Sequence, residues 1–114
     1  MLTNTTERTT DLAQADALLQ KALPQIELEV FDEPTIEALQ KAMKLYEKWE
    51  VKEKMAEVYQ YLGATVGFEE AVAYYQKSLD IRLDLYGESH ETVAKTYGLL
   101  GMACLGLQDF KRSK

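Results

Sequence analysis

The sequence predicts an all-α fold in which helical hairpins stack on one another as a short solenoid. Val93–Lys114 contains an aromatic residue, a leucine and a glycine, then a second aromatic and a small residue, and a near-copy lies upstream. The equivalent aromatics Phe68 and Phe110 lie 42 positions apart. Ala71 and Ser113 have the same separation of 42 positions. Self-similarity at a constant spacing of this length is typical of stacked helix pairs.

Length and composition favour one small soluble domain. The chain has 114 residues, a formal net charge of −6 and one cysteine, Cys104. The acidic balance argues against nucleic acid or an anionic membrane as the main partner. A lone cysteine forms no intrachain disulfide, and the polar start MLTNTTERTTDLAQ lacks the apolar run of a signal peptide. Since no stretch approaches the roughly 20 apolar residues of a membrane span, we expect a cytoplasmic protein.

The N-terminal part is expected to hold a tail and one helix. Residues 1–9 are polar and rich in threonine, which predicts a disordered tail before a helical domain at 10–114. The first helix should run from about Asp11 to at least Leu23. Its apolar stripe consists of Leu12, Ala15, Leu19, Ala22 and Leu23.

Pro24 should kink or end this helix, because proline lacks a backbone donor. The run Ile26–Phe31 alternates as a strand does, but a lone strand would have no partner in an all-helical chain. We therefore expect the helix to continue past Pro24. Asp32 and Pro34 then restart the chain, since proline suits a first helical turn.

Further helices are predicted over residues 35–48, 51–65 and 68–85, from a cap at Ser89 to near Gly106, and from Asp109 onward. The interval from Gly63 to the next aromatic is shorter by one helical turn than that following Gly101. Any groove at the end of the 51–65 helix should therefore be truncated.

These segments resemble the tetratricopeptide repeat, in the 42-residue form typified by kinesin light chains. The resemblance rests on AEVYQYLG, FEEAVAYYQKSLDIRLDLYGESHETVAKTYGLLG and QDFKRS, and it covers about residues 35–114. It implies a short right-handed α-solenoid of such hairpins, with an N-terminal helix packed on the first hairpin and a truncated last repeat.

Packing in such a repeat needs small side chains where two helices approach to roughly 8–10 Å, and aromatic side chains where the gap is wider. The small positions are Gly63, Gly101, Ala71 and Ser113. The gap-filling aromatics are Tyr59, Tyr97, Phe68 and Phe110. A large side chain at Gly101 should overpack the seam and destabilise the fold.

Catalytic and metal-binding signals are weak. Cys104 is expected to be a buried structural thiol, because His90 lies 14 residues before it, about 21 Å along a helix. His90 is in a linker, YGESHE, which resembles the inter-repeat turn of the family and implies a structural role there. The carboxylates and pairs such as Lys77 and Arg82 are typical of solvated helix faces. Neither a metal-ligand cluster nor a phosphate loop is present, so we expect no enzyme, metal or cofactor.

The family binds peptides on a concave face lined by the first helix of each repeat. By register, the partner-binding positions are Glu57, Gln60, Tyr61, Ala64, Lys95, Gly98, Leu99, Met102 and Leu105. Tyr61 and Leu99 replace the asparagine that peptide-clamping members often have, so asparagine-mediated gripping of a peptide is not expected. The positions from Gly98 to Leu105 are mostly apolar. They form an apolar docking groove, or the first helix or another chain covers them.

The sequence therefore predicts a non-catalytic protein-interaction or assembly module that binds a peptide or partner helix. The alternative is a regulatory or sensor segment of a larger protein whose output domain is absent. Because the stretch from Val93 to Leu107 is apolar nearly all round, we also expect a homo-oligomer through the C-terminal end. A two-fold copy or an exchanged C-terminal segment would cover it.

Overall fold

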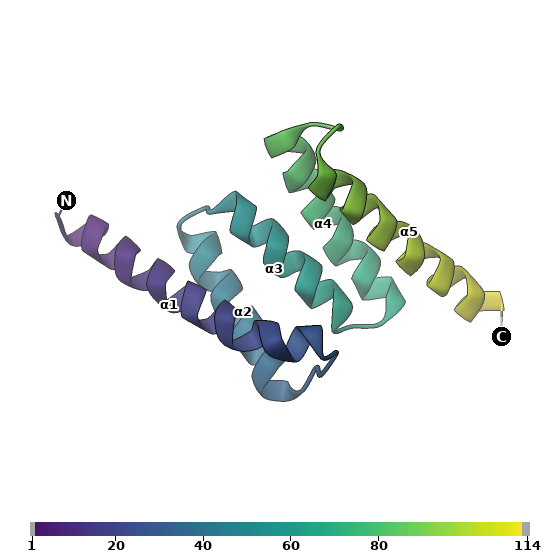
Figure 1. The fold of residues 1–114 in the computed structure, drawn as a ribbon, viewed down its shortest axis with the longest axis horizontal. Helices are drawn as coiled ribbons and strands as arrows, with labels where there is room; N and C mark the ends of the chain where they lie inside the picture. The colour runs from purple at the N-terminus through teal and green to yellow at the C-terminus, as the bar shows by residue number, and fades with distance from the viewer. Residues whose placement is uncertain (1, 113–114) are drawn as a thin grey trace. The chain divides into compact units, whose positions relative to one another are not determined.

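The computed structural model describes residues 2–112, with side chains described for residues 5–109. This range consists of helices joined by short turns and contains no strand, so the all-α prediction is confirmed. The helices are α1 (Leu2–Glu27), α2 (Glu33–Lys48), α3 (Lys52–Ala64), α4 (Phe68–Tyr86) and α5 (Glu91–Arg112) (Figure 1). The chain divides into two compact units, Met1–Val58 and Tyr59–Lys114.

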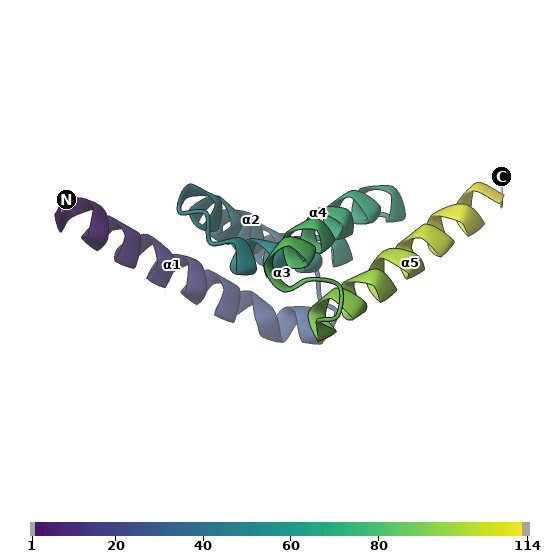
Figure 2. The same ribbon diagram turned by 90° about the horizontal axis from the view of Figure 1, so that it is seen from above.

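In the first unit, α1 packs along α2 and the two helices form a hairpin (Figures 1 and 2). The apolar stripe predicted for the first helix supplies one side of its core, with Ala15, Leu19 and Ala22 buried. The other side comes from the buried α2 residues Ala38, Leu39, Ala42, Met43 and Tyr46. Burying these apolar side chains is the main source of stability for the hairpin.

Polar contacts extend the pairing of α1 and α2 beyond the apolar core. Lys48 Nζ lies 2.6 Å from Glu7 Oε1 and 2.9 Å from Asp11 Oδ2, and Trp49 Nε1 donates to the same Asp11 oxygen at 2.9 Å. The hydrogen bond from Lys48 lowers the pKa of Asp11, and the bond to Glu7 raises the pKa of Lys48. The Tyr46 hydroxyl donates to Asp16.

The start predicted for the first helix is wrong. α1 begins at Leu2 rather than near Asp11, so the segment predicted as a tail is helical from residue 2 onward. Glu7 lies one turn before Asp11 on the same face, and both carboxylates reach Lys48. Sequence periodicity does not predict that these two carboxylates share Lys48 as a partner. The assignment of residues 10–114 to a single domain stays a prediction.

Pro24 lies inside α1, which continues to Glu27 as predicted. The helix then closes with a turn in which Val30 N donates to the Gln25 carbonyl at 2.8 Å. Glu29 takes a positive φ of 58° in this turn. The alternating run after Pro24 therefore reverses the chain, and no strand forms there.

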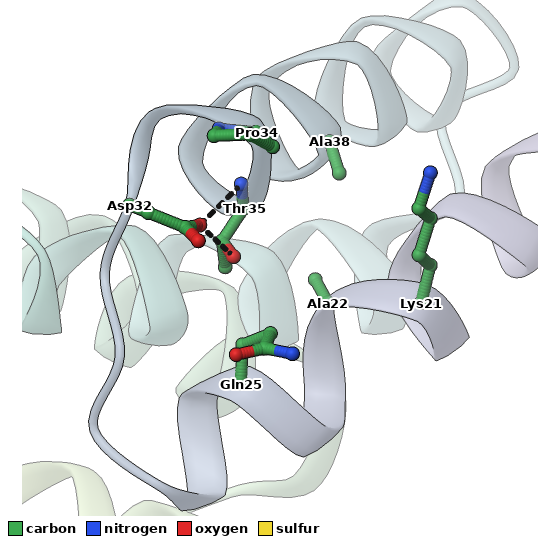
Figure 3. Close-up of a pocket in the computed structure, with 7 residues that line it drawn as sticks. All are labelled: Lys21, Ala22, Gln25, Asp32, Pro34, Thr35 and Ala38. Carbon is green, nitrogen blue, oxygen red and sulfur yellow. Dashed lines mark hydrogen bonds between the residues drawn. The ribbon is translucent and has the colours of Figure 1, made fainter.

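Asp32 is the N-cap of α2. One of its carboxylate oxygens accepts from the Thr35 backbone N–H at 3.1 Å and from the Thr35 hydroxyl, with Pro34 in the first turn (Figure 3). The side-chain bond from Thr35 is the main cause that lowers the pKa of Asp32. A carboxylate at this position satisfies a helix N–H that has no partner inside the helix.

Replacing Asp32 by alanine should lower the melting temperature by roughly 4–8 °C, whereas asparagine, an equally good cap, should retain most of the stability. The pKa of Asp32 in the folded state lies below its ordinary value of 3.8, so the charged cap stabilises the fold above that pH. The contribution is lost as the pH falls through the lowered pKa. Melting followed by circular dichroism should therefore show the wild type and Asp32→Asn differing less at pH 2 than at pH 7. An unchanged melting temperature in Asp32→Ala would show that the cap is dispensable.

In the second unit, α4 packs on α5, and the end of α3 packs on α4 (Figure 1). The rings of Tyr59 on α3 and Tyr74 on α4 have centroids 6.1 Å apart. A cluster of Ala71, Tyr75 and Ala103 forms the buried core, with partly buried apolar side chains around it. Burial raises the pKa of Tyr75. The paired helices predicted over residues 51–65 and 68–85 are thus present with boundaries within a few residues.

The predicted break between Gly106 and Asp109 does not occur, and α5 runs unbroken to Arg112. A Cβ added at Gly106 would lie 2.5 Å from Cε1 of Phe68, so this glycine makes room for an aromatic ring instead of ending a helix. The predicted cap is also different. His90 rather than Ser89 receives the Thr92 backbone N–H, at 3.1 Å, on its Nδ1.

Several predicted packing roles are wrong. Tyr97 is 49% exposed instead of filling a gap, Phe68 packs beside Gly106 but is still 50% exposed, and Cys104 is exposed instead of buried. A Cβ at Gly101 would meet nothing within 4 Å, whereas one at Gly63 would lie 2.6 Å from Tyr75 Cε1. Tyr97, Gly101 and Cys104 lie on a side of α5 that no helix among the described residues of this unit covers. The side chains of Phe110 and Ser113 lie outside the described residues.

Candidate partner-binding groove

The second unit contains an apolar groove of about 230 Å³. The end of α3 and the turn after it supply Gly63, Ala64 and Val66. The α4 helix supplies Phe68, Ala71 and Tyr75, and α5 supplies Leu99, Met102 and Ala103. None of these side chains is charged. The groove is open, since Met102 on its wall is 70% exposed.

Three of the predicted partner-binding residues, Ala64, Leu99 and Met102, meet in this groove. The others lie elsewhere on the same helices. Gly98, Lys95 and Leu105 are exposed on α5, and Tyr61 is partly buried on α3. Glu57 on α3 has its carboxylate 3.7 Å from Lys54 Nζ, one turn earlier on that helix.

Gln60 accepts a hydrogen bond from Arg82, a residue that the sequence analysis places on a solvated helix face. Arg82 was expected on a solvated face, but it is only 9% exposed. Its Nη1 donates to Gln60 Oε1 at 2.6 Å and to Thr96 Oγ1 at 2.7 Å. The Thr96 hydroxyl donates in turn to the Thr92 carbonyl at 2.7 Å.

Arg82 thus connects α4 to both helices that supply predicted partner-binding positions. Because the Gln60 oxygen accepts from Arg82, the amide nitrogen of Gln60 retains its two N–H donors. A signal for this role is present in the sequence. Arg82 follows Ala71, Tyr75 and Ser78 at helical spacing, and all four are buried on one face of α4.

A second hollow, of about 420 Å³, lies beside the first and shares Phe68 with it. Its lining consists of Gly67, Phe68, Glu69, Glu70 and Leu107. Phe68 and Leu107 supply apolar surface, and the two glutamates are exposed in the first turn of α4. The hollow therefore combines an apolar floor with negative charge.

A smaller hollow of about 140 Å³ lies between α1 and α2 in the first unit (Figure 3). Its lining includes Lys21, Gln25 and the Asp32–Thr35 cap. Figure 3 shows the polar atoms of Asp32 and Thr35 bonded to one another. The hollow is small, and the Asp32 carboxylate that lines it is already hydrogen-bonded to Thr35. We therefore interpret it as a gap in helix packing and not as a ligand site.

Among the described residues, no three His, Cys, Asp or Glu side chains gather where they could hold a metal ion. The His90 ring stacks on Tyr86 with centroids 4.2 Å apart while its Nδ1 accepts from Thr92, which confirms a structural role in the inter-helix turn. None of the described helices has the length and apolar character needed to cross a membrane.

Helical hairpins with an open apolar groove on one side are typical of repeat modules that bind other proteins. Comparison with known families supports this class of interaction module, because a family model described as tetratricopeptide repeat matches residues 50–113. The chain belongs to the tetratricopeptide repeat family, which is a family of protein–protein interaction modules. Neither the curated proteins nor the solved structures provide a match.

Proposed function

We propose that the chain is a non-catalytic interaction module that binds a segment of a partner protein in the apolar groove. The observation that carries this proposal is the exposure of Met102, at 70%, on the wall of a groove that contains no charge. An exposed apolar surface of this kind on a folded unit marks an interaction site. A cytoplasmic location belongs to the same proposal, since the only cysteine is exposed and free.

The volume of the groove indicates which kind of ligand it can bind. Its volume of about 230 Å³ is smaller than the roughly 300–1,000 Å³ of small-molecule sites. It suits one or two apolar side chains of a peptide or helix. Gln60 and Lys95 provide polar groups outside the groove, as a polar rim does around an apolar interface.

Replacing Met102 by glutamate should abolish most of the binding, because an uncompensated charge would be buried in the complex. The probe is a random peptide library displayed on phage and selected on the immobilised protein. We expect the selected peptides to share apolar residues, and Met102→Glu to weaken them by at least about tenfold. The matched control is Ala94→Glu, an exposed α5 position outside the groove. Selection of peptides that bind Met102→Glu and the wild type equally would contradict the proposed site.

We further propose that the protein self-associates through α5. Tyr97 and Leu105, on this helix but outside the groove, are 49% and 63% exposed, which is a large apolar surface for one helix. A second copy would remove this surface from water. Sedimentation equilibrium across the micromolar range tests the idea, and a monomer throughout that range would overturn it.

A further inference from the structure

The sequence repeat carries opposite charges in its two copies, at the start of α4 and in the last turn of α5. At a spacing of 42 residues, Phe68-Glu69-Glu70-Ala71 corresponds to Phe110-Lys111-Arg112-Ser113. Each segment begins with an aromatic residue and ends with a small one. The two residues between them are acidic in the first copy and basic in the second.

The acidic segment lies at the second hollow. Glu69 and Glu70 border it, and Phe68 and Leu107 supply its apolar surface. Both glutamates are exposed, and none of the side chains described for residues 5–109 forms an ion pair with them. This hollow therefore fits an apolar side chain that is followed directly by cations.

We propose that two copies of the chain associate about a two-fold axis, each placing residues 110–112 on the acidic hollow of the other. This inference rests on the proposed self-association and adds a contact at the C-terminal end of α5. An aromatic residue followed by lysine and arginine has the chemistry that the hollow requires. The acidic hollow and the basic segment that would bind it are thus both present in one chain.

The backbone of α5 makes the two-fold arrangement possible. The helix continues through Arg112, and Figures 1 and 2 both show its last turns projecting past the start of α4. Residue 111 lies four residues after Leu107, about 6 Å further along the helix axis. Two antiparallel α5 ends related by an axis between these positions place residue 111 of one copy beside Leu107 of the other. Each copy then gives and receives the same contact, which closes the dimer.

Charge reversal and charge exchange test this contact. The acidic side is changed by the pair Glu69→Lys and Glu70→Lys, and the basic side by the pair Lys111→Glu and Arg112→Glu. Asp84→Lys with Glu88→Lys is the matched control, because it changes the net charge by the same amount as the first pair at exposed positions of the same unit. Each protein is studied alone, and the two reversed variants are also mixed in equal amounts, by sedimentation equilibrium.

We expect the wild type and the control to form dimers. Each reversed variant alone should raise the dissociation constant at least about tenfold, because like charges then meet at both contacts. The mixture should restore dimers, since the basic hollow of one variant receives the acidic segment of the other, and the unchanged halves also match. Recovery in the mixture also shows that both variants are folded.

Other outcomes separate the two proposals. If the wild type dimerises and both reversed variants dimerise equally well, the contact is wrong while self-association stands. A wild type that is monomeric across the micromolar range overturns both. Species that grow beyond the dimer with concentration overturn the two-fold form. Reversed variants that change only the melting temperature, with no dependence on concentration, show that residues 110–112 bind the hollow of their own chain and overturn the proposal.

Discussion

Replacing Arg82 by methionine is expected to lower the free energy of unfolding by about 2–3 kcal/mol. Arg82 is 9% exposed and connects Gln60 on α3 to Thr96 on α5 through hydrogen bonds of 2.6 and 2.7 Å. Hydrogen bonds to a charged group are stronger than those between neutral groups, and Thr96 is fully buried. Methionine keeps most of the side-chain volume, so the loss should come from the polar contacts and not from a cavity.

Urea unfolding followed by circular dichroism is the measurement. Lys41→Met is the control, since Lys41 is an exposed basic residue on a helix and its substitution should change stability by less than about 0.5 kcal/mol. The Arg82 variant should also weaken the peptides selected on the groove, because Gln60 is no longer held. Equal stability of Arg82→Met and the wild type would mean that the desolvation of the guanidinium cancels its hydrogen bonds.

The order and type of the helices could be predicted because they depend on local signals. Asp32 and Pro34 mark the start of α2, and Gly87 marks the end of α4 with a positive φ of 79°. Apolar residues at helical spacing mark the buried face of each helix between such signals. These signals act within one or two turns, so they can be read without knowing the tertiary structure.

Three of the wrong predictions concern residues whose role depends on a distant partner. Gly106 looks like a helix end, but the ring that occupies the space beside it belongs to Phe68, on another helix. Arg82 looks like a surface cation, but its partners Gln60 and Thr96 lie 22 and 14 residues away. Glu7, in the part of α1 predicted as a tail, pairs with Lys48, which is 41 residues away in the sequence. Helical spacing places Arg82 on the buried face of α4, but in none of these cases does it identify the distant partner.

The groove could be predicted in part, for a geometric reason. Repeat register predicts which side of a helix a residue occupies, and this was sufficient for Ala64, Leu99 and Met102. Register does not predict where along the helix a hollow opens. That position depends on the end of α3 at Ala64 and on the Phe68 ring at the start of α4. Lys95 and Gly98 lie nearer the start of α5 and are exposed outside the groove.

Two glycines that the repeat pattern treats as equivalent should respond to alanine in opposite ways. At Gly63, a Cβ would lie 2.6 Å from Cε1 and 2.9 Å from Cδ1 of Tyr75. The Tyr75 ring is buried in the core of the second unit and has little room to move. Overpacking of this kind should lower the free energy of unfolding by about 1–3 kcal/mol.

At Gly101, nothing lies within 4 Å of the added Cβ, and the residue is inside α5. Alanine there should raise the free energy of unfolding by about 0.5–1 kcal/mol, because it restricts the unfolded chain and favours the helix. Each variant is the control for the other, since both make the same chemical change inside a helix of the repeat. Urea unfolding should place the midpoint of Gly63→Ala below that of the wild type and the midpoint of Gly101→Ala above it. A loss of stability in both variants would show that α5 is covered at Gly101, as the repeat pattern alone predicts.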